Sequence, residues 1–136
     1  MVSKFQHLVF YVNDLEESRA FFSQLLDLQL SALNHPDSSA AMKLANQEMR
    51  FMSFGFYHHD ICLVKHRKLQ FDNESLMHYT MVIRDSTAYD KILVNAQKMG
   101  IATKEGRMIK SAKMENHWKA FCFQDPNKHW IELILK

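Results

Sequence analysis

Two histidines and one glutamate stand in strand-like segments that are otherwise apolar. His7 lies in FQHLVFYV, His78 in MHYTMVI and Glu132 in WIELIL. A carboxylate buried in an apolar strand is costly unless a cation or a hydrogen-bond donor accompanies it. Imidazole and carboxylate groups are ordinary ligands of divalent metals. The three residues together therefore predict one shared metal site.

The spacing of these residues indicates a duplicated unit. His7 and His78 are 71 positions apart, Asp14 and Asp85 are also 71 positions apart, and Cys62 in DICL lies 70 positions before its counterpart in WIEL. Two unrelated strand–helix pieces could share one such offset by chance, whereas a duplication explains all three.

The first copy of the unit begins with a strand over residues 5–12, which is rich in Val, Phe and Tyr. Asp14 then predicts the N-cap of a helix, because acidic residues and helically spaced apolar residues follow it over 15–26. Two further strand-like runs occupy residues 50–56 and 60–65. We expect the helix to lie on a sheet made by these strands.

The second copy repeats this plan. A strand over 77–83 is followed by a helix start at Arg84-Asp85 and a helix over 87–99. The remaining strand-like pieces are residues 101–109, 118–123 and 129–135. Each copy is too small to bury its own sheet, so we expect an α+β fold in which two βαβββ modules, about 1–68 and about 74–136, form the single domain 1–136.

Length, charge and cysteine content limit the class of protein. The 136 residues are enough for one ordinary domain. The 17 basic and 15 acidic residues form no long basic run, so nucleic acid is not expected as a partner. No apolar stretch reaches the roughly 18 residues that cross a bilayer, and no signal peptide is apparent, so we expect a cytoplasmic protein without membrane contact. Cys62 and Cys122 are expected to be reduced thiols.

Three segments resemble the glyoxalase, bleomycin resistance and extradiol dioxygenase superfamily, also called vicinal oxygen chelate proteins. They are QHLVFYVNDLEESRAFFSQLLDL, MHYTMVIRD and the terminal FCFQDPNKHWIEL, of which the last is the most specific. The resemblance covers nearly the whole chain. It implies two βαβββ modules that form a half-open, mixed-sheet cleft with metal ligands on its strands.

The resemblance also implies a role for each candidate ligand. His7 would be the ligand of the first strand, His78 of the fifth and Glu132 of the eighth, while Cys62 stands where some members have a fourth ligand. Two imidazoles and one carboxylate leave open positions on one divalent metal ion, with Fe²⁺ favoured and Mn²⁺, Ni²⁺ or Zn²⁺ as alternatives. Short members commonly pair, so we expect a homodimer. The site could lie within one chain or be shared between two.

By ligand count the chain is most similar to extradiol, ring-cleaving dioxygenases, and we expect a metal-dependent enzyme with a small-molecule substrate. Two positions depart from that pattern, because Cys122 replaces a tyrosine and Lys128 replaces a glycine. The alternatives are a glyoxalase-I-like lyase, a fosfomycin-type thiol transferase and a metal-free protein that sequesters drugs. The residues expected to line the substrate pocket are Tyr11, Cys62, Trp118 and Cys122. No residue is assigned as a general base.

Overall fold

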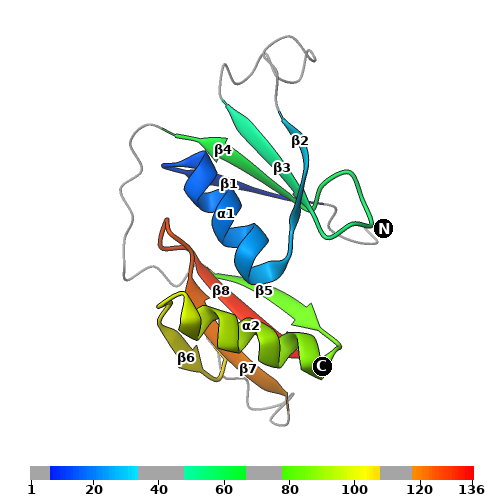
Figure 1. Cartoon of the computed structure of the whole chain (residues 1–136), viewed down its shortest axis with the longest axis vertical. Helices are drawn as coiled ribbons and strands as arrows, with labels where there is room; N and C mark the ends of the chain where they lie inside the picture. Colours follow the sequence, from blue (N-terminus) through cyan, green and yellow to red (C-terminus); the bar gives the residue numbers. More distant parts are fainter. Residues whose placement is uncertain (1–6, 34–47, 67–77, 108–117) are drawn as a thin grey trace. The chain divides into compact units, whose positions relative to one another are not determined.

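Two units with the same order of helices and strands make up the chain (Figure 1). The structure is a computed structural model and describes residues 7–33, 48–66, 78–107 and 118–136. Unit 1 is Met1–Gln70 and unit 2 is Phe71–Lys136. Within the described ranges, no helix is long and apolar enough to cross a membrane.

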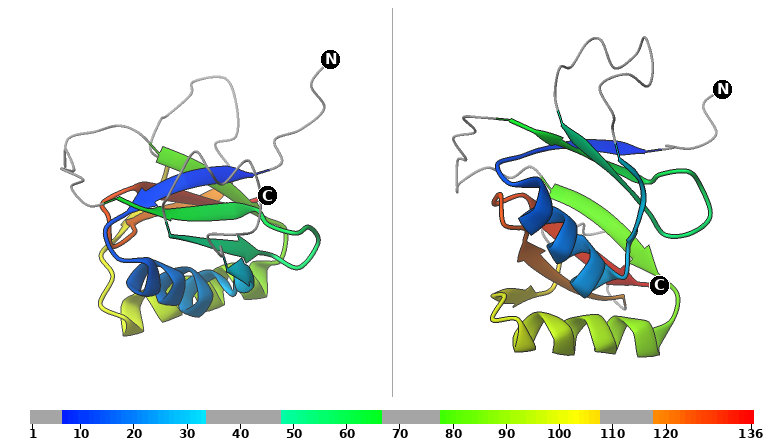
Figure 2. Two further views of the ribbon diagram at one scale, coloured as in Figure 1. Left: turned by 90° about the horizontal axis from the view of Figure 1, so that it is seen from above. Right: turned by 45° about the horizontal axis from the view of Figure 1, so that its top comes forward.

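Unit 1 is a four-stranded mixed sheet with one helix on one of its faces (Figure 2). Its elements are β1 (Leu8–Val12), α1 (Leu15–Leu26), β2 (Gln29–Leu33), β3 (Met49–Ser53) and β4 (Ile61–Lys65). The strand order is β1-β4-β3-β2. β1 and β4 are parallel, whereas the other two pairs are antiparallel. The last strand of the unit therefore lies beside the first.

The side chains of β1 alternate between the helix and the opposite face of the sheet. Phe10 and Val12 are buried, and the Phe10 ring stacks on Phe22 of α1 with centroids 5.9 Å apart. Val9 and Tyr11 point the other way and are 50% and 48% exposed. This period of two is what a sheet with a single helix-covered face requires.

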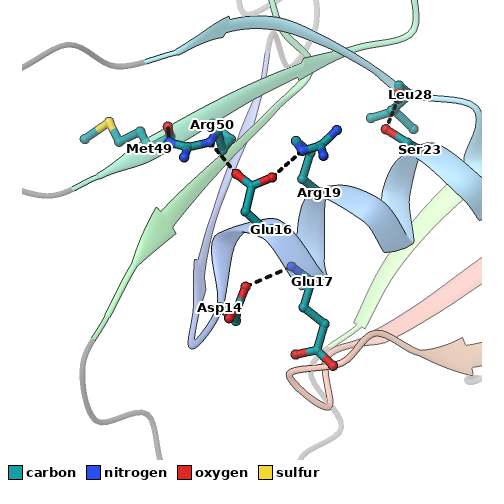
Figure 3. A network of polar contacts seen from close by, with 8 residues as sticks. All are labelled: Asp14, Glu16, Glu17, Arg19, Ser23, Leu28, Met49 and Arg50. Carbon is teal, nitrogen blue, oxygen red and sulfur yellow. Dashed lines mark hydrogen bonds and ion pairs between the residues drawn. The ribbon is translucent and has the colours of Figure 1, made fainter.

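The first turn of α1 is tied to the sheet by polar contacts (Figure 3). The carboxylate of Asp14 accepts a hydrogen bond of 2.9 Å from the Glu17 amide and so caps the helix. Glu16 accepts from Arg19 at 2.8 Å and from Arg50 of β3 at 2.9 Å. These two guanidinium groups hold the pKa of Glu16 below its ordinary value. The Glu16 pair with Arg50 connects the helix start to β3.

Unit 2 repeats the architecture. Its elements are β5 (His78–Ile83), α2 (Ser86–Lys98), β6 (Thr103–Glu105), β7 (Lys119–Gln124) and β8 (Trp130–Leu135). The strand order is β5-β8-β7-β6, with β5 and β8 parallel and the other pairs antiparallel. Asp85 caps α2 by accepting from the amides of Thr87 and Ala88. The predicted α+β fold of two βαβββ modules is confirmed.

The structure differs from the sequence prediction in the strands. β2 was not predicted, because QLSAL mixes apolar and polar residues and its pairing is interrupted by an irregularity between Leu30 and Ala32. The strand predicted over 50–56 ends at Ser53, since Gly55 adopts a φ of 100° and turns the chain. The strand predicted over 101–109 is observed over Thr103–Glu105, and its last two residues lie outside the described part of the chain.

Candidate functional site

Glu132 lies in β8 and points away from helix α2. In the neighbouring β7, the ring of Phe121 contacts Tyr89 of α2, with centroids 5.2 Å apart, so Phe121 faces the helix. Cys122 follows Phe121 and is therefore on the opposite side, and it pairs in register with Glu132. Thr80 of β5 pairs with Glu132 from the other flank. We call the surface formed by Thr80, Cys122 and Glu132 the Glu132 face.

The Glu132 carboxylate is completely buried and is held by two donors of its own unit. The Thr80 hydroxyl donates to Oε2 at 2.6 Å, and Nε of Arg107 donates to Oε1 at 2.9 Å. The contact with Arg107 is an ion pair as well as a hydrogen bond, and the Arg107 side chain is 27% exposed. A buried carboxylate needs such compensation, because the loss of hydration would otherwise cost several kcal/mol.

His78 brings an imidazole to the same carboxylate. It is the first residue of β5, its side chain is 18% exposed, and its Nε2 lies 3.9 Å from Oε2 of Glu132. A nitrogen and an oxygen bound to adjacent positions of one metal at about 2.1 Å are roughly 3 Å apart. A modest side-chain adjustment would therefore let His78 and Glu132 bind the same ion.

The chemistry of this pair suits a divalent metal, but the pair is not a complete site. Among the described residues, no group of three or more His, Cys, Asp or Glu side chains is arranged to hold a metal ion. Unit 2 supplies His78 and Glu132, whereas the third predicted ligand, His7, belongs to unit 1. The described residues of unit 2 therefore supply two of the three predicted ligands.

The remaining predicted residues of unit 1 lie on or beside its first strand. His7 is exposed, directly precedes β1, and contacts the ring of His59 with centroids 4.5 Å apart. Burial, followed by the effects of His7 and His58, holds the pKa of His59 below its ordinary value. Tyr11 is half exposed, whereas Cys62 is buried, and burial raises the pKa of that thiol to about 11. Cys62 is therefore a protonated thiol at neutral pH.

The two other predicted pocket residues have different surroundings. Cys122 is buried on the Glu132 face and its thiol donates to the Gly106 carbonyl at 3.3 Å. Trp118 instead lines a hollow of about 640 Å³ whose other walls come from α2, β6 and β7. Glu132 does not line that hollow. Cys62 and Cys122 are both thiols and are not joined in a disulfide.

The terminal motif that is most specific in the sequence builds the turn before β8. Asp125 is buried and accepts from the amides of Asn127 and His129 at 2.9 and 2.8 Å. Its second oxygen lies 2.7 Å from Nδ1 of His129. Lys128 occupies this turn with a φ of 67°, a conformation that favours glycine. The motif thus sets where β8 starts and, through it, the position of Glu132.

Sequence reasoning missed two residues that contact Glu132. Thr80 could have been found, because it stands two positions after His78 and shares its face of the strand. Arg107 gave no such signal, because it was placed within the strand predicted over 101–109, whereas the observed β6 ends at Glu105. The Asp125 turn was noted as a motif, but its structural role was not predicted.

Comparison with known proteins gives a family match over most of the chain. The profile described as Glyoxalase/Bleomycin resistance protein/Dioxygenase superfamily matches residues 4–133. No curated protein matches the sequence significantly.

Solved structures of low sequence identity share the fold. A glyoxylase/bleomycin resistance protein/dioxygenase domain from Frankia sp. EAN1pec is 18% identical, with a TM-score of 0.75 over 99% of this chain and 98% of that one. The fosfomycin resistance protein FosX from Mesorhizobium loti is 18% identical, with a TM-score of 0.71 over 100% and 94% of the two chains. FosX from Listeria monocytogenes, as a mutant complexed with Mn(II) and 1S,2S-dihydroxypropylphosphonic acid, gives the same identity, TM-score and coverages.

Proposed function

Because the chain belongs to the Glyoxalase/Bleomycin resistance protein/Dioxygenase superfamily, we propose that it is an enzyme that binds one divalent metal ion through His7, His78 and Glu132. The observation that supports this most is the buried Glu132 carboxylate with the His78 imidazole 3.9 Å away. The substrate would be a small molecule that presents two neighbouring oxygen atoms to the metal.

Each residue of the Glu132 face has a defined part in this proposal. His78 and Glu132 would bind the ion, and Thr80 would hold Oε2 of the carboxylate in a fixed direction through its 2.6 Å hydrogen bond. When bound, the metal would supply Lewis-acid stabilisation of negative charge on a substrate oxygen. The three-ligand set favours Fe²⁺, and the Mn(II) complex of the Listeria FosX mutant supports a divalent ion in a protein of this fold.

Among the reactions of the superfamily, extradiol ring cleavage is our first candidate. Two histidines and one carboxylate are the ligand set of non-haem Fe(II) oxygenases, and His7, His78 and Glu132 would hold such an ion for this chemistry. The raised pKa of Cys62 supports a set of three ligands without this residue, because a protonated, buried thiol is a poor fourth ligand. Cys122 stands where ring-cleaving relatives have a phenol, so any acid of this enzyme would have to be another group. Tyr11, Cys62, Trp118 and Cys122 stay our candidates for the substrate pocket.

A fosfomycin-type reaction is the second candidate. Two FosX proteins, from Mesorhizobium loti and Listeria monocytogenes, match this chain over its entire length. One of them is complexed with Mn(II) and a dihydroxypropylphosphonic acid. A polar Thr80 beside the carboxylate is compatible with binding such a polar substrate.

The metal-free, drug-sequestering alternative has one observation in its favour. Arg107 already neutralises Glu132 without any metal, so the carboxylate is compensated in the protein alone. The glyoxalase-I-like alternative would need the fourth ligand at Cys62.

We further propose that the protein is a homodimer, in which His7 of either copy completes the metal site. Light scattering of the purified protein would measure its oligomeric state.

The test is anaerobic reconstitution with Fe(II), Mn(II), Ni(II) and Zn(II), followed by assays with a catechol, a methylglyoxal–thiol adduct and fosfomycin. Dioxygen uptake with the catechol is the expected result. Glu132→Gln should abolish it, whereas Glu17→Gln, the same chemical change at an exposed position of α1, should preserve it. Turnover of the methylglyoxal adduct or of fosfomycin would show that ring cleavage is the wrong reaction. Tight binding of an aromatic drug without metal would contradict the proposal that the protein is a metal-dependent enzyme.

A further inference from the structure

Arg107 occupies the place of a counter-ion to a carboxylate that we propose as a metal ligand. Its Nε donates to Oε1 of Glu132 at 2.9 Å, and Glu132 is fully buried. The carboxylate has one negative charge to share between a guanidinium and a metal ion. A cation already bound to one oxygen lowers the attraction of the other oxygen for a second cation.

We infer that Arg107 and the divalent metal compete for Glu132, so that Arg107 stabilises the metal-free protein and weakens metal binding. This inference rests on the proposed metal site. The Arg107 side chain follows the short strand β6 and is 27% exposed, so part of it already reaches solvent. If it stays in place, its charge repels the ion within the same low-dielectric surroundings.

The opposite role is a supporting one, in which Arg107 positions the carboxylate for the metal. Hydrogen-bond partners of metal ligands commonly strengthen metal binding, and their loss weakens it about 10- to 100-fold. Thr80 has the properties of such a partner, because a neutral hydroxyl orients Oε2 without adding charge. A guanidinium adds a full positive charge, and this charge is the reason that we assign competition to Arg107.

The experiment measures Mn(II) affinity by isothermal titration calorimetry in metal-free protein. Arg107→Gln keeps a hydrogen-bond donor but removes the charge, and we expect it to bind Mn(II) about tenfold more tightly than the wild type. Arg107→Lys keeps the charge and should stay near the wild-type value. Unchanged or weaker binding by Arg107→Gln would overturn the inference while leaving the proposed metal site intact.

Lys104→Gln is the matched control for the loss of one positive charge. Lys104 belongs to β6, pairs with Cys122, and places its Nζ 4.7 Å from the centre of the Trp130 ring. If Lys104→Gln tightens Mn(II) binding as much as Arg107→Gln, general electrostatics explains the gain and the specific competition is wrong. If neither the wild type nor Arg107→Gln binds Mn(II), the proposed metal site and this inference fail together.

A second readout follows the arginine itself. The Nε–H signal of Arg107 in nitrogen-15 NMR spectra should shift and exchange faster with water when diamagnetic Zn(II) is added. In Glu132→Gln protein the same addition should leave the signal unchanged. An Arg107 signal that stays constant in the wild type while Zn(II) binds would contradict competition.

Discussion

Unit 1 and unit 2 share their strand order and their aspartate-capped helices but differ on the sheet face that points away from the helix. Where unit 2 pairs Thr80 with Glu132, unit 1 pairs Val9 with Cys62. The first pair is a hydroxyl and a carboxylate, whereas the second is an aliphatic side chain and a protonated thiol. One scaffold therefore has a charged centre in one copy and an apolar one in the other.

The difference shows what a buried charge requires of its surroundings. Cys62 is buried, pairs with Val9 and Phe51 on the neighbouring strands, and needs no counter-charge, because a thiol behaves as a small hydrophobic group. Glu132 needs both Thr80 and Arg107 within hydrogen-bonding distance. In unit 2 the additional polar residues Thr80 and Arg107 therefore accompany the carboxylate.

The largest expected effect is on the core of each unit. Leu63 of β4 and Leu133 of β8 occupy equivalent strands and are completely buried. Leu63→Ala and Leu133→Ala should each lower the free energy of unfolding by about 2–5 kcal/mol, because each leaves a cavity. Urea denaturation measures this. A loss below about 1 kcal/mol in one variant would show that the two cores are not equivalent.

The second effect separates the two faces. Glu132→Gln should weaken Mn(II) binding at least about 100-fold, because it removes a charged ligand. Cys62→Ala, the matched substitution in unit 1, should leave Mn(II) affinity within about twofold of the wild type. Calorimetric titration of metal-free protein gives both values. Equal losses in the two variants would make Cys62 a ligand and remove the distinction between the units.

The helix caps should respond alike in both units. Asp14→Ala and Asp85→Ala should each cost about 1 kcal/mol of stability, because each removes the acceptor of the first free amides of its helix. Asp90→Ala, an exposed substitution inside α2, is the control and should stay within about 0.5 kcal/mol of the wild type. Thermal or urea unfolding measures all three. A cap variant that behaves like the control would contradict the assigned capping role.

The turns before the last strands of the two units both contain a residue with positive φ, but the residue type differs. Unit 1 has Gly55 at a φ of 100°, whereas unit 2 has Lys128 at a φ of 67°. Lys128→Gly should stabilise the protein by up to about 1 kcal/mol, because it relieves a left-handed lysine. Gly55→Ala should destabilise it, although no atom lies within 4 Å of the added methyl position. Urea denaturation measures the free energy of unfolding of both variants. A loss of stability in Lys128→Gly together with a gain in Gly55→Ala would contradict the prediction.

The smallest effect concerns acid. The pKa of Glu16 is lowered by Arg19 and Arg50, whereas α2 has no acidic residue in its first turn. A lowered pKa means that the stabilisation is present above the ordinary value of 4.5 and is lost as the pH falls through the folded-state pKa. Glu16→Gln should remove this acid-dependent part, about 0.5 kcal/mol or less for so exposed a pair. Unfolding curves between pH 3 and 7 measure it, and an unchanged pH profile in the variant would contradict the assignment.

Much of the fold could be predicted because duplication repeats a pattern. His7 and His78 each stand in an apolar strand-like run, and Asp14 and Asp85 each follow that run at the same distance. These two repeats define two strand–helix starts. Glu132 stood out for a physical reason, since a carboxylate in an apolar strand must be compensated.

The rest depended on contacts that local sequence does not encode. Arg107 reaches Glu132 only because β6 pairs with β7 and β7 with β8, which brings the end of β6 near the carboxylate. β2 has no clear alternation and forms through its pairing with β3. Trp118 stays a prediction for the substrate pocket, and local sequence did not predict the hollow beside α2, β6 and β7 that it lines.

The account depends above all on a metal ion at Glu132, and anomalous diffraction from crystals grown with Mn(II) tests this most directly. We predict a manganese peak about 2.2 Å from a carboxylate oxygen of Glu132 and from the imidazole of His78, with His7 of the same chain or of a second copy as the third ligand. Crystals that contain manganese elsewhere, with the Arg107–Glu132 ion pair intact and no peak beside it, would contradict the account.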